Sequence, residues 1–153
     1  MIKNLTYHQH SDLEDILELV GKPFGFWYRI KNIGKIRSPR MLIVNSSPRI
    51  NQHLIKAHNV NQSEIERRPK GILIHFFSVL NHYVWVIPYE NLNIERLGTT
   101  YRVFTSTDYI RFSNKFISAQ HQSFIELIRL ECENVKKNMP QPAYSDAPEQ
   151  KAI

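Results

Sequence analysis

Between residues 27 and 40 two aromatic residues, Trp27 and Tyr28, precede a series of basic ones, and these are the residue types most suited to binding a ligand. Lysine and arginine bind phosphate oxygens through charge-assisted hydrogen bonds, and aromatic rings offer flat faces for stacking. A turn that carries several such cations would present them together to an anionic group. We therefore predict a binding site for a phosphate-bearing or acidic partner, formed by Trp27, Tyr28, Arg29, Lys31, Lys35, Arg37 and Arg40.

The charge of the chain is unevenly distributed. The formal net charge is +6. The segment 22–70 contains eleven lysines and arginines but only two acids, Glu64 and Glu66, so it carries +9 and the rest of the chain is slightly acidic. Such asymmetry favours an anionic partner, either lipid head groups or nucleic acid. The alternative is a solvated basic surface that only aids solubility.

Residue patterns that support catalysis are sparse. The sequence has no G-x-S-x-G motif and no glycine-rich phosphate loop. Cys132 falls on the apolar stripe of a predicted helix, which favours a packed small side chain over a nucleophile. Glu90, Glu95 and Asp108 are separated by predicted turns, which favours turn and surface roles for them. We predict no catalytic residue; enzymatic activity is left open, and a non-enzymatic protein is favoured.

The spacing of the histidines does not predict a metal site. Zinc needs several Cys or His ligands at defined spacing. His8 and His10 form one pair and His53 and His58 another, but neither pair has a third ligand near it. His75 lies inside an apolar run, where a hydrogen-bonded core histidine is expected. No metal ion and no cofactor are therefore predicted.

Two helices are predicted from apolar residues at helical spacing. The first covers 12–20, with Ser11 and Glu14 placed to form a capping box. The second covers 118–138 and ends before Pro140. These two elements are expected at the two ends of the fold.

Alternation of apolar and polar residues predicts the strands between the helices. The predicted strands are 24–33, 39–45, 53–60, 71–80, 83–89, 99–104 and 109–113. The basic turn joins the first two into a hairpin, and Asn81-His82 is expected to turn the chain between the two central strands. The segment 46–69 is open to two interpretations: a helix capped at Ser47 with Pro48 in its first turn, or a turn and the strand 53–60, which we slightly prefer.

These elements predict an α+β fold, with a mostly antiparallel sheet or a barrel of about seven strands, an N-terminal helix and a closing C-terminal helix. The length of 153 residues favours one domain over 1–138 and a flexible tail over 139–153. No secretory signal and no apolar stretch of bilayer-spanning length is visible, and there is a single cysteine. A cytoplasmic location is therefore expected.

The order of the predicted elements resembles pleckstrin-homology (PH) and GRAM domains over most of residues 24–138. The stretch YVWVIPYENL at 83–92 resembles a strand, Ile-Pro, turn passage common in bacterial PH-like domains. Lys31, Lys35 and Arg37 match the loose K-x(n)-K-x-R pattern of the family. The resemblance implies two bent sheets closed by a helix, with these cations holding a phosphorylated head group.

A second resemblance is to restriction-nuclease-like folds of the PD-(D/E)xK type. The helix 12–20 followed by FWYRIK at 26–31 has the order of that fold, and Ile87, Pro88 and Leu92 match its I-P-x-x-x-L passage. Arg29-Ile30-Lys31 would occupy the E-x-K position, where a guanidinium cannot hold Mg²⁺ as a carboxylate does. This resemblance implies an inactive relative that binds DNA.

The predicted function is a non-enzymatic binding module that recognises a phosphate-bearing or acidic partner through the basic hairpin turn. One alternative is the nuclease-like DNA-binding fold. Another is a protein-protein adaptor that docks its partner on the strand edge at 24–27 or on the proline-containing tail.

Overall fold

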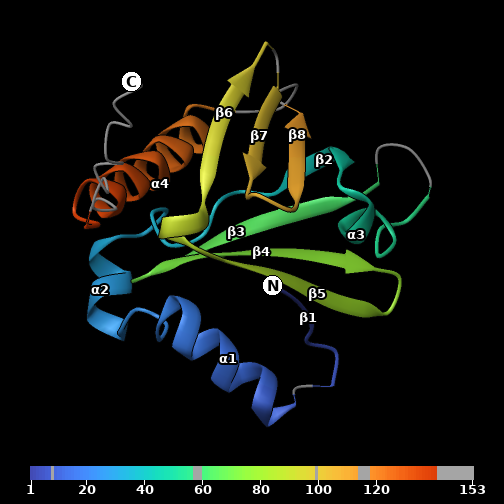
Figure 1. The fold of residues 1–153 in the computed structure, drawn as a ribbon, viewed down its shortest axis with the longest axis horizontal. Coiled ribbons are helices and arrows are strands. Elements are labelled where there is room, and N and C mark those ends of the chain that lie inside the picture. The colour runs from blue at the N-terminus through green and yellow to red at the C-terminus, as the bar shows by residue number, and fades with distance from the viewer. Residues whose placement is uncertain (8, 57–59, 99, 114–117, 141–153) are drawn as a thin grey trace, which may run out of the picture.

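The structure, a computed structural model, describes residues 1–7, 9–56, 60–98, 100–113 and 118–140. Over these residues the chain forms an open, eight-stranded antiparallel sheet with four α-helices (Figure 1). The strand order is β1-β5-β4-β3-β2-β8-β7-β6, so β1 and β6 are the two edges. The α+β class, the antiparallel sheet and the helices near both ends are confirmed. The described sheet has one strand more than predicted and does not close into a barrel.

The strands and helices have the following bounds along the chain. The strands are β1 (Ile2–Asn4), β2 (Met41–Ser46), β3 (Gln62–Arg68), β4 (Gly71–Ser78), β5 (Asn81–Pro88), β6 (Asn93–Leu97), β7 (Thr100–Phe104) and β8 (Tyr109–Ser113). The helices are α1 (His10–Val20), α2 (Phe26–Lys31), α3 (Pro48–Asn51) and α4 (Ala119–Lys137), with a 3₁₀ turn, η1, at Tyr89–Asn91.

The sheet bends at β2, which belongs to both of its halves. Met41 and Leu42 pair with β3, whereas Ile43 to Ser46 pair with β8, and the register shifts between Ile43 and Asn45. A bulge of this kind bends a strand and increases its twist. The half formed by β6, β7 and β8 therefore stands upright over the half formed by β3, β4 and β5 (Figure 1).

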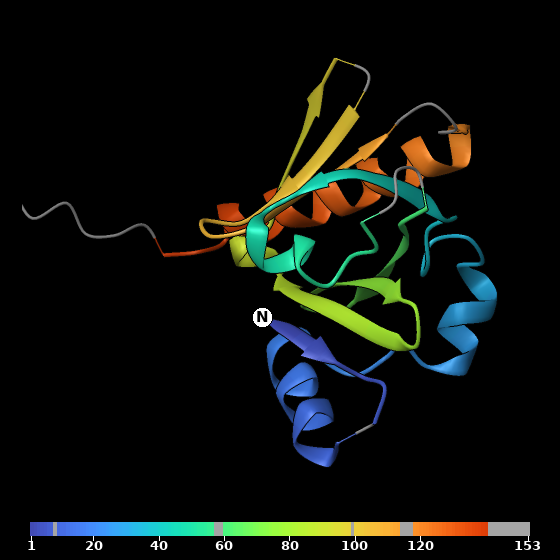
Figure 2. The same ribbon diagram turned by 90° about the vertical axis from the view of Figure 1, so that its right-hand side faces the viewer.

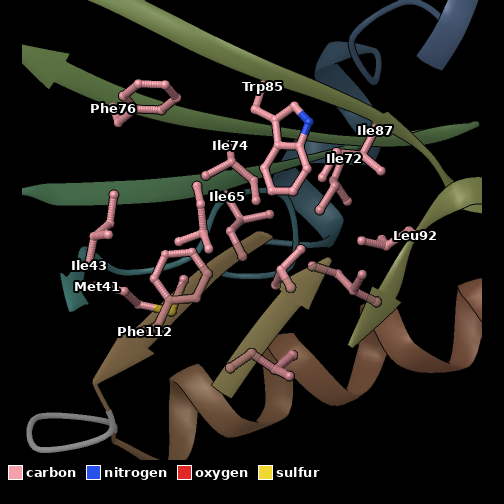
Figure 3. Packing of buried hydrophobic residues seen from close by; sticks show 14 of the residues in the cluster. Met41, Ile43, Ile65, Ile72, Ile74, Phe76, Trp85, Ile87, Leu92 and Phe112 are labelled. Atoms are coloured by element: carbon pink, nitrogen blue, oxygen red, sulfur yellow. The ribbon is translucent and has the colours of Figure 1, made fainter. Parts of the chain in front are cut away.

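The main core lies in the angle between the two halves of the sheet. Ile72, Ile74 and Phe76 from β4 and Trp85 and Ile87 from β5 point into it, as the period of two requires (Figure 3). The upright half and α4 supply the opposite wall, with Phe112 and Met41 visible in Figure 3. The predicted helix 118–138 is thus confirmed as α4, and its apolar stripe closes this core.

The helix α1 covers the other face of β4 and β5 (Figure 2). Ile16 and Val20 pack there against Leu73, Val84 and Val86. The prediction of a helix over 12–20 is confirmed, although the helix begins two residues earlier. The predicted capping box does not form, because Gln9 is the N-cap residue and its side chain makes no capping hydrogen bond.

Two predicted strands, 24–33 and 53–60, are wrong. Residues 26–31, placed in the strand 24–33, form the helix α2. The interpretation that we ranked second is correct for α3, since Ser47 precedes a helix with Pro48 in its first turn. No strand occupies 53–56, residues 57–59 lie outside the described residues, and the strand of this region is β3 further along.

The remaining predicted strands agree with the structure to within a few residues. The turn between β4 and β5 differs from the prediction. The β4–β5 hairpin turns at Val79 and Leu80, not at Asn81-His82, and Val79 has a φ of 47°. The short strands β1 and β6 were not predicted. Within the described ranges no helix is long and apolar enough to cross a membrane. The predicted tail lies outside the described residues from 141 onward.

Candidate functional site

The helix α2 is held to the sheet by the side chain of one buried arginine. Phe24 and Tyr28, four residues apart, stack with their ring centroids 4.4 Å apart. The guanidinium of Arg67 on β3 lies 5.1 Å from the centroid of the Phe24 ring and donates a hydrogen bond of 2.8 Å to the Tyr28 hydroxyl. A cation on an aromatic face is attracted by the ring quadrupole. This contact fixes which side of α2 faces the protein.

The opposite side of α2 carries large apolar side chains that face solvent. None of the residues of α2 is buried. Phe26, Trp27 and Ile30 have exposed fractions of 69%, 75% and 46%. At 100° per residue these three share one face, and Tyr28 lies roughly opposite to it. The amphipathicity of α2 is therefore inverted at Phe26 and Trp27, which point away from the core, whereas Tyr28 on the other side is 40% exposed.

Cationic side chains border this apolar stripe. Arg29 and Lys31 lie on its two sides by the same helical geometry. Both are exposed, as are Lys22 before the helix and Lys35 after it. No ion pair or side-chain hydrogen bond to any of these four is found within the described part of the chain. We call this set the α2 surface: Lys22, Phe26, Trp27, Arg29, Ile30, Lys31, Ile33 and Lys35.

Two of the predicted binding residues lie elsewhere or are already paired. Arg37 forms ion pairs with Glu64 at 2.6 Å and with Glu66 at 2.7 Å, so its charge is neutralised within the protein. Arg40 lines a separate groove of about 390 Å³ together with Phe77. The basic residues thus do not form one hairpin turn. Of the seven predicted residues, four belong to the α2 surface, namely Trp27, Arg29, Lys31 and Lys35. Tyr28 lies on the opposite side of the helix, where it contacts Arg67.

A groove continues the α2 surface toward α4. It has a volume of about 520 Å³ and lies between the turn 33–35 and the first half of α4. Ile33 lines it from one side and Leu127 and Leu130 from the other. The acid on its wall, Glu126, is engaged by Arg129 on the same helix. The groove is therefore mainly apolar and lacks an unpaired acid among these lining residues.

A buried polar network lies on the α1 side of the sheet. Glu66 accepts hydrogen bonds from Arg37, from Arg68 at 2.6 Å and from His75 at 3.0 Å. Burial raises the pKa of the Glu66 carboxyl, but the His75 hydrogen bond and the two guanidinium charges outweigh it and lower the pKa to about 2. His75 also contacts His82, with 2.9 Å between Nδ1 and Nε2.

This network confirms that His75 is a hydrogen-bonded core histidine. An ionised carboxylate only accepts hydrogen bonds, so Nε2 of His75 must carry the proton toward Glu66. In neutral His75 the other nitrogen then accepts from His82. The alternation of Glu64, Glu66 and Arg68 is the sequence signal for this arrangement, because it places all three on one face of a strand. The predicted strand 53–60 does not include these residues.

Two groups with the chemistry of a nucleophile, the thiol of Cys132 and the hydroxyl of Ser47, belong to buried residues. Burial raises the pKa of the Cys132 thiol to about 11, which disfavours the reactive thiolate. Ser47 donates a hydrogen bond of 2.9 Å to Asp108, whose other oxygen lies 3.2 Å from Arg49. Asp108 is thus a buried residue that ties α3 to the β7–β8 turn, not the surface residue we expected. Cys132 is confirmed as a packed side chain.

No cluster of three or more His, Cys, Asp or Glu with metal-binding geometry occurs within the residues that the structure describes. His8 and His58, one member of each sequence pair, lie outside those residues. His10 lies beside Glu14 on α1, and the ring of His53 packs on Tyr83.

No family model, curated protein or solved structure matches the chain. The resemblances to PH-like and nuclease-like proteins accordingly stay predictions. The strand that both resemblances use at 24–33 is replaced by α2 over 26–31.

Proposed function

We propose that this protein is a non-enzymatic binding module that recognises a phosphate-bearing or acidic partner through the α2 surface. This keeps the function predicted from the sequence but moves the site from a hairpin turn to a helix and the residues around it. Arg29, Lys31 and Lys35 supply the charge, and Trp27 supplies an exposed ring. Arg37 and Arg40 are left out of the site.

One observation carries the proposal: three exposed cations, which have no side-chain partner among the described residues, lie beside the exposed aromatic side chains of Phe26 and Trp27. Burying apolar surface lowers the free energy, so a stable fold gains nothing from placing Phe26 and Trp27 outward. Free cations beside them add charge-assisted hydrogen bonds to an anion. A purely solubilising surface would not need the exposed rings.

Paired cations elsewhere on the protein support the same distinction. Arg37, Arg68 and Arg129 are each engaged by carboxylates. Such pairs neutralise charge, although each exposed one adds no more than about 1 kcal/mol to stability. The cations of the α2 surface contribute no ion pair among the described residues, which leaves their charge available to a partner.

The test is a binding assay with two phosphate-bearing probes, namely a single-stranded oligonucleotide and vesicles that contain phosphatidylglycerol, at low and at high salt. The variant Arg29→Gln/Lys31→Gln/Lys35→Gln should lose most of the binding to whichever probe is bound. The control Lys56→Gln/Lys70→Gln/Lys137→Gln removes the same charge from exposed lysines outside the surface.

We expect salt-sensitive binding of at least one probe, because contacts with phosphates release counterions. The proposal fails if the protein binds neither probe at low salt. It also fails if both triple variants weaken binding equally, since net charge rather than the α2 surface would then account for it.

A further inference from the structure

We infer that the partner of the α2 surface is an anionic lipid bilayer, with Phe26, Trp27 and Ile30 inserted among the head groups. The inference rests on the proposed function and adds the class of partner and the way it is bound. It follows from the orientation of the side chains rather than from the charge alone.

The apolar stripe of α2 needs an apolar environment that the described part of the protein does not supply. In globular proteins the apolar stripe of a helix normally packs on the core. In α2 the inner position is taken by Tyr28, which is fixed by Arg67, and the outer positions by Phe26, Trp27 and Ile30. A bilayer interface is a partner that accepts such a stripe, with tryptophan favoured at the level of the head groups.

The positions of the charges fit this orientation. Arg29 and Lys31 extend from opposite sides of the stripe, and both have long side chains that place their charge beyond their apolar stems. With the stripe inserted, the two charges would lie in the layer of lipid phosphates. Each Lys or Arg near an anionic membrane surface strengthens binding about fivefold. The charges and the stripe thus favour the same docked orientation.

The surroundings of α2 extend this surface rather than interrupt it. Ile33, with an exposed fraction of 83%, continues the apolar side chains into the groove that Leu130 lines from α4. Lys35 lies in the wall of this groove. Figure 1 places α2 at the periphery of the fold, with the sheet on one side of it only. A flat partner can therefore approach the helix without contact with the sheet.

Nucleic acid fits the same residues less well. Helices that read duplex DNA present polar side chains to the base edges, whereas the outer positions of α2 are apolar. Single strands bind in grooves in which successive bases stack on aromatic rings. Ile30 and Ile33 have no flat ring on which a base could stack. The apolar stripe also lies on the outer surface of a helix and not in a groove.

The test measures flotation of the protein with phosphatidylcholine vesicles, with and without phosphatidylglycerol. We expect binding only to the anionic vesicles and about 100-fold weaker binding by the variant Arg29→Gln/Lys31→Gln/Lys35→Gln. The variant Phe26→Ser/Trp27→Ser should lose at least about tenfold in affinity for the same vesicles, because burial of each ring is lost. The matched control Val79→Ser/Leu80→Ser alters two exposed apolar residues in the β4–β5 turn and should bind as the unaltered protein does.

Tryptophan fluorescence reports insertion directly. Trp27 is 75% exposed and Trp85 is 1% exposed, so lipids with brominated acyl chains should quench Trp27 and leave Trp85 unaffected. The quenching should disappear in the variant Trp27→Phe. Circular dichroism should show an unchanged fold in all variants of α2, since none of its residues is buried.

The outcomes separate the two claims. Binding of the oligonucleotide but not of vesicles, or vesicle binding that Phe26→Ser/Trp27→Ser leaves intact, overturns the bilayer inference while the proposed function stands. Equal binding to neutral and anionic vesicles also overturns it. If neither probe is bound at low salt, both claims fall together.

Discussion

The guanidinium of Arg67 and the hydroxyl of Tyr28 are joined by a hydrogen bond of 2.8 Å, which connects the central strand β3 to the inner side of α2. The same guanidinium donates to the carbonyl of Lys35 at 2.9 Å and lies over the ring of Phe24. Arg67 is itself 5% exposed. One buried side chain therefore positions both the helix and the turn that follows it.

Replacing Arg67 by alanine should release α2 from the sheet. The variant loses two hydrogen bonds and a cation–π contact and leaves a cavity, so we expect a loss of about 2–4 kcal/mol in the free energy of unfolding. Urea denaturation measures this loss. Hydrogen exchange should also speed up at the amides of Arg29 and Asn32, which close the turns of α2.

The milder variant Tyr28→Phe serves as the control for Arg67→Ala. It removes one hydrogen bond and keeps the stacked rings, so the expected loss is about 1 kcal/mol. If the rate of hydrogen exchange at the amides of α2 is the same in Arg67→Ala as in the unaltered protein, other contacts hold the helix.

Acid should destabilise the protein through Glu66. The pKa of this carboxyl is about 2 in the folded protein, against an ordinary value of 4.5. A lowered pKa gives stability that is complete above the unfolded value and is lost as the pH falls from about 5 toward 2. The full effect amounts to at most about 3 kcal/mol.

Urea denaturation across this pH range tests the role of Glu66. The variant Glu66→Gln should be less stable near neutral pH and should lose much of the decrease in stability between pH 5 and pH 2. Glu95→Gln, which breaks the surface pair with Arg102, serves as a control and should keep that decrease. A decrease of the same size in Glu66→Gln and in the unaltered protein would exclude Glu66 as its source.

A methyl group at Gly71 should not fit. A Cβ at this position would lie 2.3 Å from the carbonyl oxygen of Ile87 and 2.7 Å from Cγ1 of Val20. Both β5 and α1 would have to move, so we expect Gly71→Ala to cost about 3 kcal/mol or to prevent folding. Thermal unfolding and the yield of soluble protein measure this.

Gly25 offers a matched comparison, since a Cβ there would meet nothing within 4 Å. Gly25→Ala should change the unfolding free energy by no more than about 1 kcal/mol, as expected for a residue that precedes a helix. Equal stability of the two alanine variants would contradict the close packing of α1 on β4 and β5.

The elements that could be predicted from the sequence are those whose spacing permits one interpretation. The apolar residues of 12–20 and 118–138 recur at helical intervals only, and both helices were located to within two residues. Residues 24–30 satisfy two patterns at once. Phe24 and Tyr28 fit a strand by alternation and a helix by their separation of four, and the contact that decides between them comes from Arg67, 39 residues away. Local patterns do not contain that contact.

For a similar reason, only part of the candidate site could be predicted from the sequence. Counting charges along 22–70 singled out Arg29, Lys31 and Lys35, which the structure places on the α2 surface. It could not show that the two acids of this region, Glu64 and Glu66, both bind Arg37, because that requires the segment 36–38 to lie beside β3. The inverted orientation of α2 was hidden as well, since an outward apolar residue looks the same in a sequence as an inward one.

The inner and outer sides of α2 are subject to separate constraints. Phe24, Tyr28 and Arg67 fasten the helix, whereas Phe26 and Trp27 are mostly exposed. Phe26 and Trp27 can therefore be exchanged at little cost to folding, so a designer could graft a new recognition sequence onto this short helix. The fold would serve as a display scaffold whose binding preference is rewritten by substitutions at the positions of this short helix other than Tyr28.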